Sequence, residues 1–177
     1  MLKKIISYGL IAGVISGGLL CVTTIGMTGN PPKHGMLIGY TIMLVALSAV
    51  FVGIKRYRDD DLGGVIRFWP AFGMGVAISF IAGIVYVAAW EAAVAVTHMD
   101  FAASYSAAMI EQQKAKGVSA EELARFVAEM ERFKVQYANP LFRLPMVFIE
   151  IFPVGVLVSL VSAGLLRNSR FLSTRRG

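Results

Sequence analysis

Four long apolar segments with almost no charge constrain this chain more than any other feature. They cover about residues 5–27, 35–54, 70–97 and 144–166. About 20 apolar residues in a helix are enough to cross a hydrocarbon core of ~30 Å. Charged residues make up only 16% of the 177 residues, against roughly 25% in a soluble domain. We therefore predict an all-α integral membrane protein with four transmembrane helices, which form a single membrane domain over residues 1–177.

The first apolar segment follows Lys3 and Lys4, so a cleaved signal peptide has to be considered. The segment is longer than the 7–15 residues of a signal-peptide core, and no small-x-small cleavage site lies near its end. We expect a retained helix, followed by a turn over residues 28–33 that contains two prolines and a glycine. Phe68, Trp69 and Pro70 open the third segment, as is typical of the interfacial aromatic belt and of a first helical turn.

Lysine and arginine gather at one set of segment ends, and this predicts the orientation. One side of the membrane would hold ten of them: Lys3, Lys4, Lys55, Arg56, Arg58, Arg67, Arg167, Arg170, Arg175 and Arg176. The basic residues of the long loop before residue 144 are diluted and mixed with acids. By the positive-inside rule both termini are then cytoplasmic. The net charge of +6 reflects topology, so we expect no nucleic-acid partner.

The loop between the third and fourth segments predicts an extramembrane helical hairpin over about residues 101–138. Gly117 separates its two helices, and Ser119 with Glu122 has the capping-box spacing. One apolar stripe runs along the second helix through Leu123, Phe126, Val127, Met130 and Phe133. The stripe either closes on the first helix or forms a docking surface for a protein or for lipid headgroups.

Small residues recur every four positions in three of the apolar segments. These ridges consist of Gly9, Gly13 and Gly17; of Ala71, Gly75, Ser79 and Gly83; and of Gly155, Ser159 and Ala163. Such ridges let helix backbones approach closely in lipid. The pattern predicts a tight bundle and leaves open whether each ridge closes within one chain or between two copies.

Two carboxylates, Glu91 and Glu150, lie inside the apolar segments, where a charge costs roughly 2.5–3.5 kcal/mol at a helix centre. His98 follows Glu91 on the same helical face, about two turns on. These three are the intramembrane polar candidates. One interpretation is structural, with hydrogen bonds to a neighbouring helix or to the interface. A second is a proton or cation site in a water-lined vestibule, and a third is pairing with a basic residue of a partner protein.

Other polar groups give no further site. We interpret Asp59, Asp60 and Asp61 as a solvated turn rather than a divalent-cation site, and His34 with His98 lacks the support that zinc requires. Cys21, the one cysteine, is expected to be a packing side chain. We predict no catalytic residue, no cofactor and no metal ligand, and therefore not an enzyme.

Several motifs resemble one known family in their order and spacing. They are KKIISYGLIAG (residues 3–13), IGYTIM (38–43), FVGIKRYRD (51–59), GGVIRF with AFGMG (63–75), YVAAWE (86–91) and EIFPVGVLVSLVSA (150–163). Together the chain resembles the bacterial membrane proteins of domain-of-unknown-function family 4199. The resemblance implies a bacterial inner-membrane protein with four spans, and it assigns no catalytic residue.

The sequence therefore favours a structural or accessory membrane protein. Its partners would be the lipid bilayer and either a second copy of the chain or another membrane protein. The alternative is a small oligomeric transporter or ion-conducting protein that uses Glu91 and Glu150. A lipid-modifying enzyme would need a nucleophile, a base or a metal cluster that the sequence does not offer.

Overall fold

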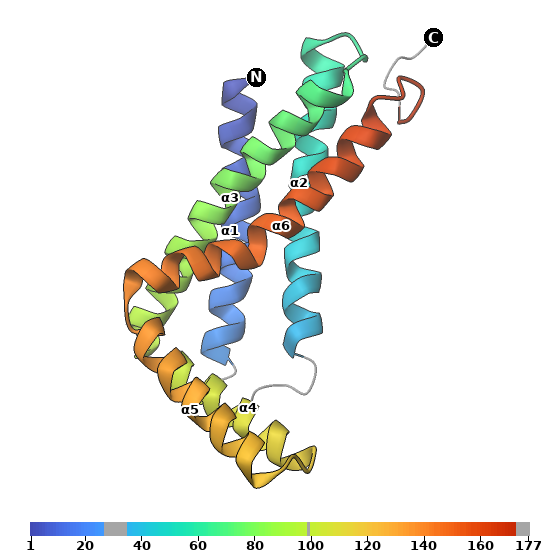
Figure 1. Cartoon of the computed structure of the whole chain (residues 1–177). Coiled ribbons are helices and arrows are strands. Elements are labelled where there is room, and N and C mark those ends of the chain that lie inside the picture. The colour runs from blue at the N-terminus through green and yellow to red at the C-terminus, as the bar shows by residue number, and fades with distance from the viewer. Residues whose placement is uncertain (27–34, 99, 173–177) are drawn as a thin grey trace. The chain divides into compact units, whose positions relative to one another are not determined.

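The computed structural model describes residues 1–26, 35–98 and 100–172, and within these residues the protein consists of helices and turns (Figure 1). The helices are α1 (Leu2–Gly26), α2 (Gly35–Asp61), α3 (Phe68–Thr97), α4 (Phe101–Ala115), α5 (Ala120–Tyr137) and α6 (Pro140–Leu166). The all-α prediction is confirmed. The turn predicted over residues 28–33 lies outside the described residues.

Four helices, α1, α2, α3 and α6, are long and apolar enough to cross a membrane. With the hairpin helices between α3 and α6, these are the features of a helical membrane protein, as predicted. Two helices, α2 and α6, extend furthest beyond the apolar segments that predicted them. Helix α2 continues through its charged residues to Asp61, and α6 begins at Pro140. Hydropathy marks only the part of a helix that suits hydrocarbon, and lysine, arginine and aspartate do not end a helix.

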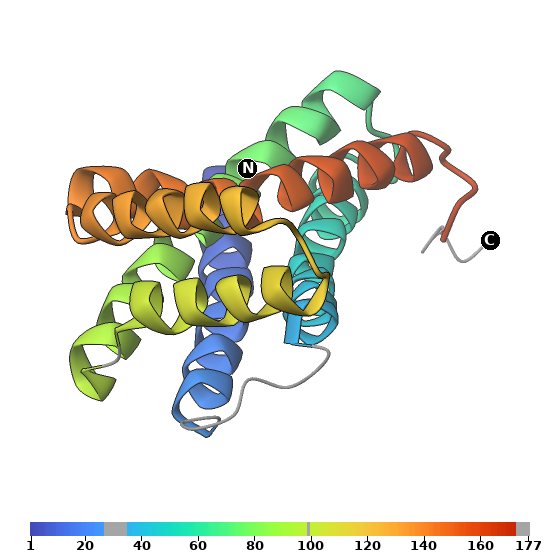
Figure 2. The same ribbon diagram turned by 60° about the horizontal axis from the view of Figure 1, so that its bottom comes forward.

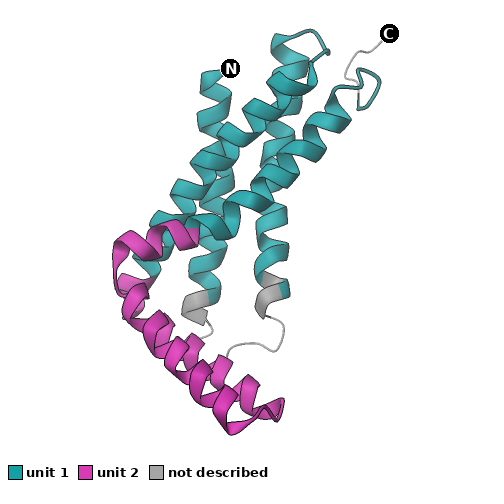
Figure 3. Cartoon of the chain, in the orientation of Figure 1, with its two compact units in different colours: residues 1–93, 148–177 teal, residues 94–147 magenta. Residues whose placement is uncertain are grey.

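The chain divides into two compact units (Figure 3). Unit 1 comprises residues 1–93 and 148–177, and so contains α1, α2, most of α3 and most of α6. Unit 2 comprises residues 94–147 and contains α4 and α5.

In unit 1 the first glycine ridge packs against α3. A Cβ added at Gly13 would lie 2.5 Å from the Cβ of Val85, and one added at Gly9 would lie 2.7 Å from the Cβ of Ile81. Gly17 meets Ala89 in the same way, at 2.6 Å. Real Cβ atoms do not approach so closely, so α1 and α3 can touch along this line only because α1 carries glycine there.

Helices α3 and α6 meet through a reciprocal pair of glycines and serines. Gly75 faces the side chain of Ser159, and Gly155 faces the side chain of Ser79. Each serine hydroxyl donates to the carbonyl four residues back, Ser79 to Gly75 at 2.9 Å and Ser159 to Gly155 at 2.7 Å. Both hydroxyls are buried and satisfied, and they lie 3.4 Å apart. The second and third ridges therefore close on each other within one chain.

Between these contacts, the core of unit 1 is filled by aliphatic side chains. Leu47, Val50 and Ile54 of α2 and Ile78 of α3 are fully buried. The three residues of α2 recur at helical spacing, which places one face of that helix inward over residues 47–54.

Unit 2 contains the helical hairpin, whose helices α4 and α5 pack against each other (Figures 1 and 2). Gly117 adopts φ 70° in the turn, a conformation that favours glycine. The predicted capping box is confirmed: the amide of Glu122 donates to the Ser119 hydroxyl, and the amide of Ser119 donates to the Glu122 carboxylate.

The apolar stripe of α5 closes on α4. Met130 is buried, and the ring of Phe133 lies 5.6 Å from that of Tyr105. Phe101 and Tyr137 complete an aromatic cluster at the open end of the hairpin, with ring centroids 5.4 Å apart. Of the two interpretations of the stripe, the structure supports packing between the hairpin helices.

Candidate functional site

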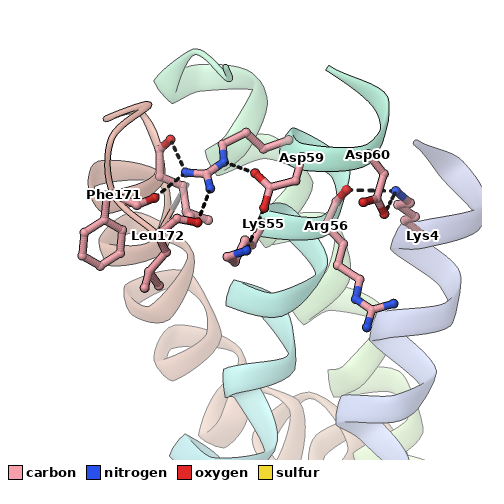
Figure 4. Close-up of polar contacts among 9 residues, drawn as sticks. Lys4, Lys55, Arg56, Asp59, Asp60, Phe171 and Leu172 are labelled. Atoms are coloured by element: carbon pink, nitrogen blue, oxygen red, sulfur yellow. Dashed lines mark hydrogen bonds and ion pairs between the residues drawn. The ribbon is translucent and has the colours of Figure 1, made fainter. Parts of the chain in front are cut away.

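The densest polar structure in unit 1 lies at one end of the bundle, where α1 begins and where α2 and α6 end (Figure 4). We call it the charged end, and its described members are Lys3, Lys4, residues 55–61, Arg67, Arg167 and Arg170.

Arg58 is the centre of this end, and its side chain is fully buried. Its Nε donates to the Asp59 carboxylate at 2.6 Å. Its terminal nitrogens donate to the carbonyls of Phe171 at 2.9 Å and Leu172 at 3.2 Å, with a longer contact to Leu166 at 3.5 Å. The last carbonyls of a helix have no partner within that helix, and a cation there also complements the helix dipole. Arg58 of α2 thus caps the end of α6 and holds the turn that follows it.

The aspartates beside Arg58 are only in part the solvated turn that the sequence predicted. All three belong to the last turn of α2, and the Asp59 side chain is only 7% exposed. Asp59 accepts from Lys55 at 2.7 Å as well as from Arg58. Lys4 of α1 pairs with both Asp60 and Asp61 and donates to the carbonyl of Arg56. The predicted turn was wrong because α2 was expected to end at Ile54, whereas the helix continues and turns Asp59 inward. Asp60 and Asp61 are solvent-exposed, as predicted, and partly neutralise a nearby basic residue.

The remaining basic residues of the charged end point outward. Lys3, Arg56, Arg67, Arg167 and Arg170 are all exposed, and none forms an ion pair within the described residues. Figure 4 shows the Arg56 guanidinium pointing away from the contacts around Asp59.

Glu150 lies exposed on α6 and makes no hydrogen bond or ion pair with any residue that the structure describes. Along α6 the spacing of four and three residues places other exposed residues on the same side. We call this surface the Glu150 face, and it consists of Glu150, Pro153, Leu157, Leu160 and Gly164. A Cβ added at Gly164 would meet no atom within 4 Å, so the face is open at that point.

The other intramembrane candidates differ from Glu150 in their surroundings. Glu91 is half-buried on α3, between the buried residues Trp90 and Ala93, and it has an interaction partner. His98 is exposed just beyond α3 and has φ 51°, a conformation that is uncommon for a residue with a side chain. Glu91 and Glu150 belong to unit 1 and His98 to unit 2. The proposed water-lined vestibule stays a prediction.

Metal-ligand geometry and the lone cysteine add little to this site. In the part of the chain that the structure describes, no group of three or more histidine, cysteine, aspartate or glutamate side chains is placed to hold a metal ion. Cys21 is partly buried, with its sulfur 3.5 Å from the carbonyl of Ala89. His34 lies outside the described residues.

Sequence reasoning missed Arg58, although a signal for it exists. The fully buried residues Leu47, Val50 and Ile54 follow one face of α2, and Arg58 comes one turn after Ile54 on that face. Extending the inward-facing register past the last apolar residue would have predicted a buried arginine.

Comparison with known proteins places these features in a family. No curated protein matches this chain, and no solved structure matches it. A family model described as "Protein of unknown function (DUF4199)" matches residues 7–168, a range that includes both Arg58 and Glu150. Since this match covers most of the chain, and since the motifs quoted above indicate the same group, the protein belongs to the DUF4199 family.

Proposed function

We propose that this protein is a structural or accessory subunit of the bacterial inner membrane, which packs against a protein partner through the Glu150 face. The partner is either a second copy of the chain or another membrane protein. In this proposal both termini are cytoplasmic, the hairpin of α4 and α5 is outside, and the chain is not an enzyme. The apolar helices and the placement of lysine and arginine support the topology.

The position of Glu150 carries the proposal. An exposed carboxylate on an apolar helix would meet lipid unless a protein covers it, and such a group is costly in hydrocarbon. Its neighbours Leu157 and Leu160 are 61% and 46% exposed, so the face offers apolar contact area as well as one polar group. Gly164 would let another helix approach closely at the far end of the same face.

The glycine ridges support this choice of surface by exclusion. Gly9, Gly13 and Gly17 pack on α3, while Gly75 and Gly155 pack on Ser159 and Ser79. Because these ridges are occupied within one chain, a partner has to use a different surface.

Site-specific crosslinking in the native membrane tests the proposal. A photoreactive amino acid replaces Leu157 on the Glu150 face, and the same amino acid replaces Val14 of α1 in the control. The two side chains are matched in exposure, at 61% and 62%. We expect a protein adduct of fixed mass from position 157 and only lipid adducts from position 14. Mass spectrometry then identifies the partner.

The adduct also distinguishes the possible partners. A heteromeric adduct supports an accessory role. A homomeric adduct with no second protein supports self-assembly, and a Glu150→Gln variant that assembles normally but loses ion flux would then favour the transport alternative. Lipid adducts alone from both positions would contradict the proposal.

A further inference from the structure

We propose that the charged end of unit 1 binds the headgroups of anionic phospholipids. The binding residues are the five outward cations described above, Lys3, Arg56, Arg67, Arg167 and Arg170. This inference does not depend on the partner of the Glu150 face.

The internal ion pairs leave this surface strongly positive. Among the described residues of the charged end, the carboxylates are those of Asp59, Asp60 and Asp61. Asp59 is paired with Arg58 and Lys55, and the other two are paired with Lys4. Every acidic side chain here is therefore paired with a cation. Lys4 joins α1 to α2, and Arg58 joins α2 to the residues after α6. Among the described residues, none of the five outward cations forms an ion pair with a carboxylate.

The chemistry of the outward cations suits phosphate. Four of the five are arginines, whose planar guanidinium groups bind phosphate oxygens in a bidentate manner. A solvated turn with unpaired aspartates would repel anions, but Asp59, Asp60 and Asp61 form ion pairs with cations. The result is a surface on which the five outward cations are available to bind phosphate.

The placement of the cations suits a lipid headgroup in particular. They lie at the start of α1, near the end of α2, just before α3 and just after α6, so they surround the end of the bundle where the apolar helices emerge (Figure 1). Trp69 is 74% exposed beside Arg67, and its ring contacts Phe68 and Phe72. An exposed tryptophan in an aromatic group is typical of the depth at which lipid headgroups lie.

Native mass spectrometry of the purified chain tests the proposal. The protein is mixed in detergent with phosphatidylglycerol or with zwitterionic phosphatidylcholine as the control lipid. We expect the wild-type protein to retain phosphatidylglycerol preferentially. A variant with Arg56→Gln, Arg67→Gln, Arg167→Gln and Arg170→Gln should lose more than about tenfold in affinity for it, since one basic residue near an anionic surface contributes about fivefold.

A matched variant controls for net charge. It carries Lys114→Gln, Lys116→Gln, Arg125→Gln and Arg132→Gln in the hairpin, which removes the same number of charges from exposed positions of unit 2. We expect its lipid preference to equal that of the wild type. Equal losses in both variants, or equal retention of the two lipids by the wild type, would overturn the proposal.

Two further measurements complete the test. Thermal unfolding of the wild type should shift upward in phosphatidylglycerol, and the shift should shrink as salt screens the charges. This result does not depend on whether the variants fold. Displacement of the lipid by millimolar inorganic phosphate would indicate a site for the free anion and would overturn the assignment to lipid. We expect no displacement.

Discussion

Arg58 shows how one side chain can join two helices, α2 and α6, at a single point. Its guanidinium is fully buried and bonds to Asp59 and to carbonyls after the end of α6, while Asp59 also binds Lys55. A buried guanidinium is stable only when its N–H donors form hydrogen bonds, and removing it leaves its buried acceptors without hydrogen-bond partners. Substitution of Arg58 should therefore destabilise the protein far more than substitution of Arg56.

Replacement of Arg58 by methionine should lower the free energy of unfolding by about 3–5 kcal/mol, because Asp59 and the carbonyls of Phe171 and Leu172 lose their donors. Arg58→Lys should give a smaller loss, since one ammonium cannot reach all the acceptors of a guanidinium. Reversible unfolding in mixed micelles measures both. Arg56→Met is the control, and it should change stability little because Arg56 is exposed and unpaired. Similar losses in the free energy of unfolding for Arg56→Met and Arg58→Met would show that the buried contacts of Arg58 are not the cause of the loss.

At this scale the sequence identified Glu150 but not Arg58, and the reason is physical. A carboxylate inside an apolar run stands out by contrast with its neighbours, whichever way it points. Arg58 lies in a run of charged residues, and only the helical register distinguishes it from Arg56. That register becomes visible once α2 is known to continue to Asp61.

Among the contacts between helices, the contact between α1 and α3 restricts the sequence most, because it requires glycine on α1. Gly13→Ala would place a Cβ 2.5 Å from the Cβ of Val85 and 3.1 Å from the carbonyl of Ala82. Neither neighbour is the end of a flexible side chain, so the helices would have to separate. We expect a loss of about 1–3 kcal/mol in the free energy of unfolding.

Gly18 provides the control for Gly13 on the same helix. A Cβ at Gly18 would meet no atom within 4 Å. Gly18→Ala should therefore leave stability unchanged or raise it, since alanine favours the helix. If both variants were equally destabilised in the same micelles, the cause would be loss of glycine in general rather than the α1–α3 contact.

The sequence predicted which faces of these elements approach closely, but it could not predict what they approach. A spacing of four between small residues indicates that another helix can approach the backbone closely, but it does not identify that other helix. The reciprocal contact of Gly75 with Ser159 and of Gly155 with Ser79 appears only when α3 and α6 are placed together. In the hairpin, the capping box was predictable because its residues are local in sequence, whereas the pairing of Tyr105 with Phe133 joins two helices.

For the whole molecule, the number and order of the helices followed from the sequence because hydrophobic length is set by the bilayer itself. The orientation is a separate prediction and rests on the distribution of lysine and arginine. A reporter that is active only outside the cytoplasm should be active when inserted after Gly117, in the hairpin turn, and inactive when inserted after Gly63, between α2 and α3. The opposite pattern of reporter activity would show that the predicted orientation is wrong.

The bonds from Arg58 to Phe171 and Leu172, far from it in sequence, bear on how the protein is made. Residues 1–93 leave the ribosome long before residues 148–177, yet both belong to unit 1. The acceptors of Arg58 at Phe171 and Leu172 follow it by 113 and 114 residues. Until Leu172 has been synthesised, the partly inserted chain holds a cation that lacks these carbonyl partners, a state open to quality-control proteases. Synthesis through Leu172 is thus a condition for stability, and a product that stops before Phe171 should be degraded rather than accumulate.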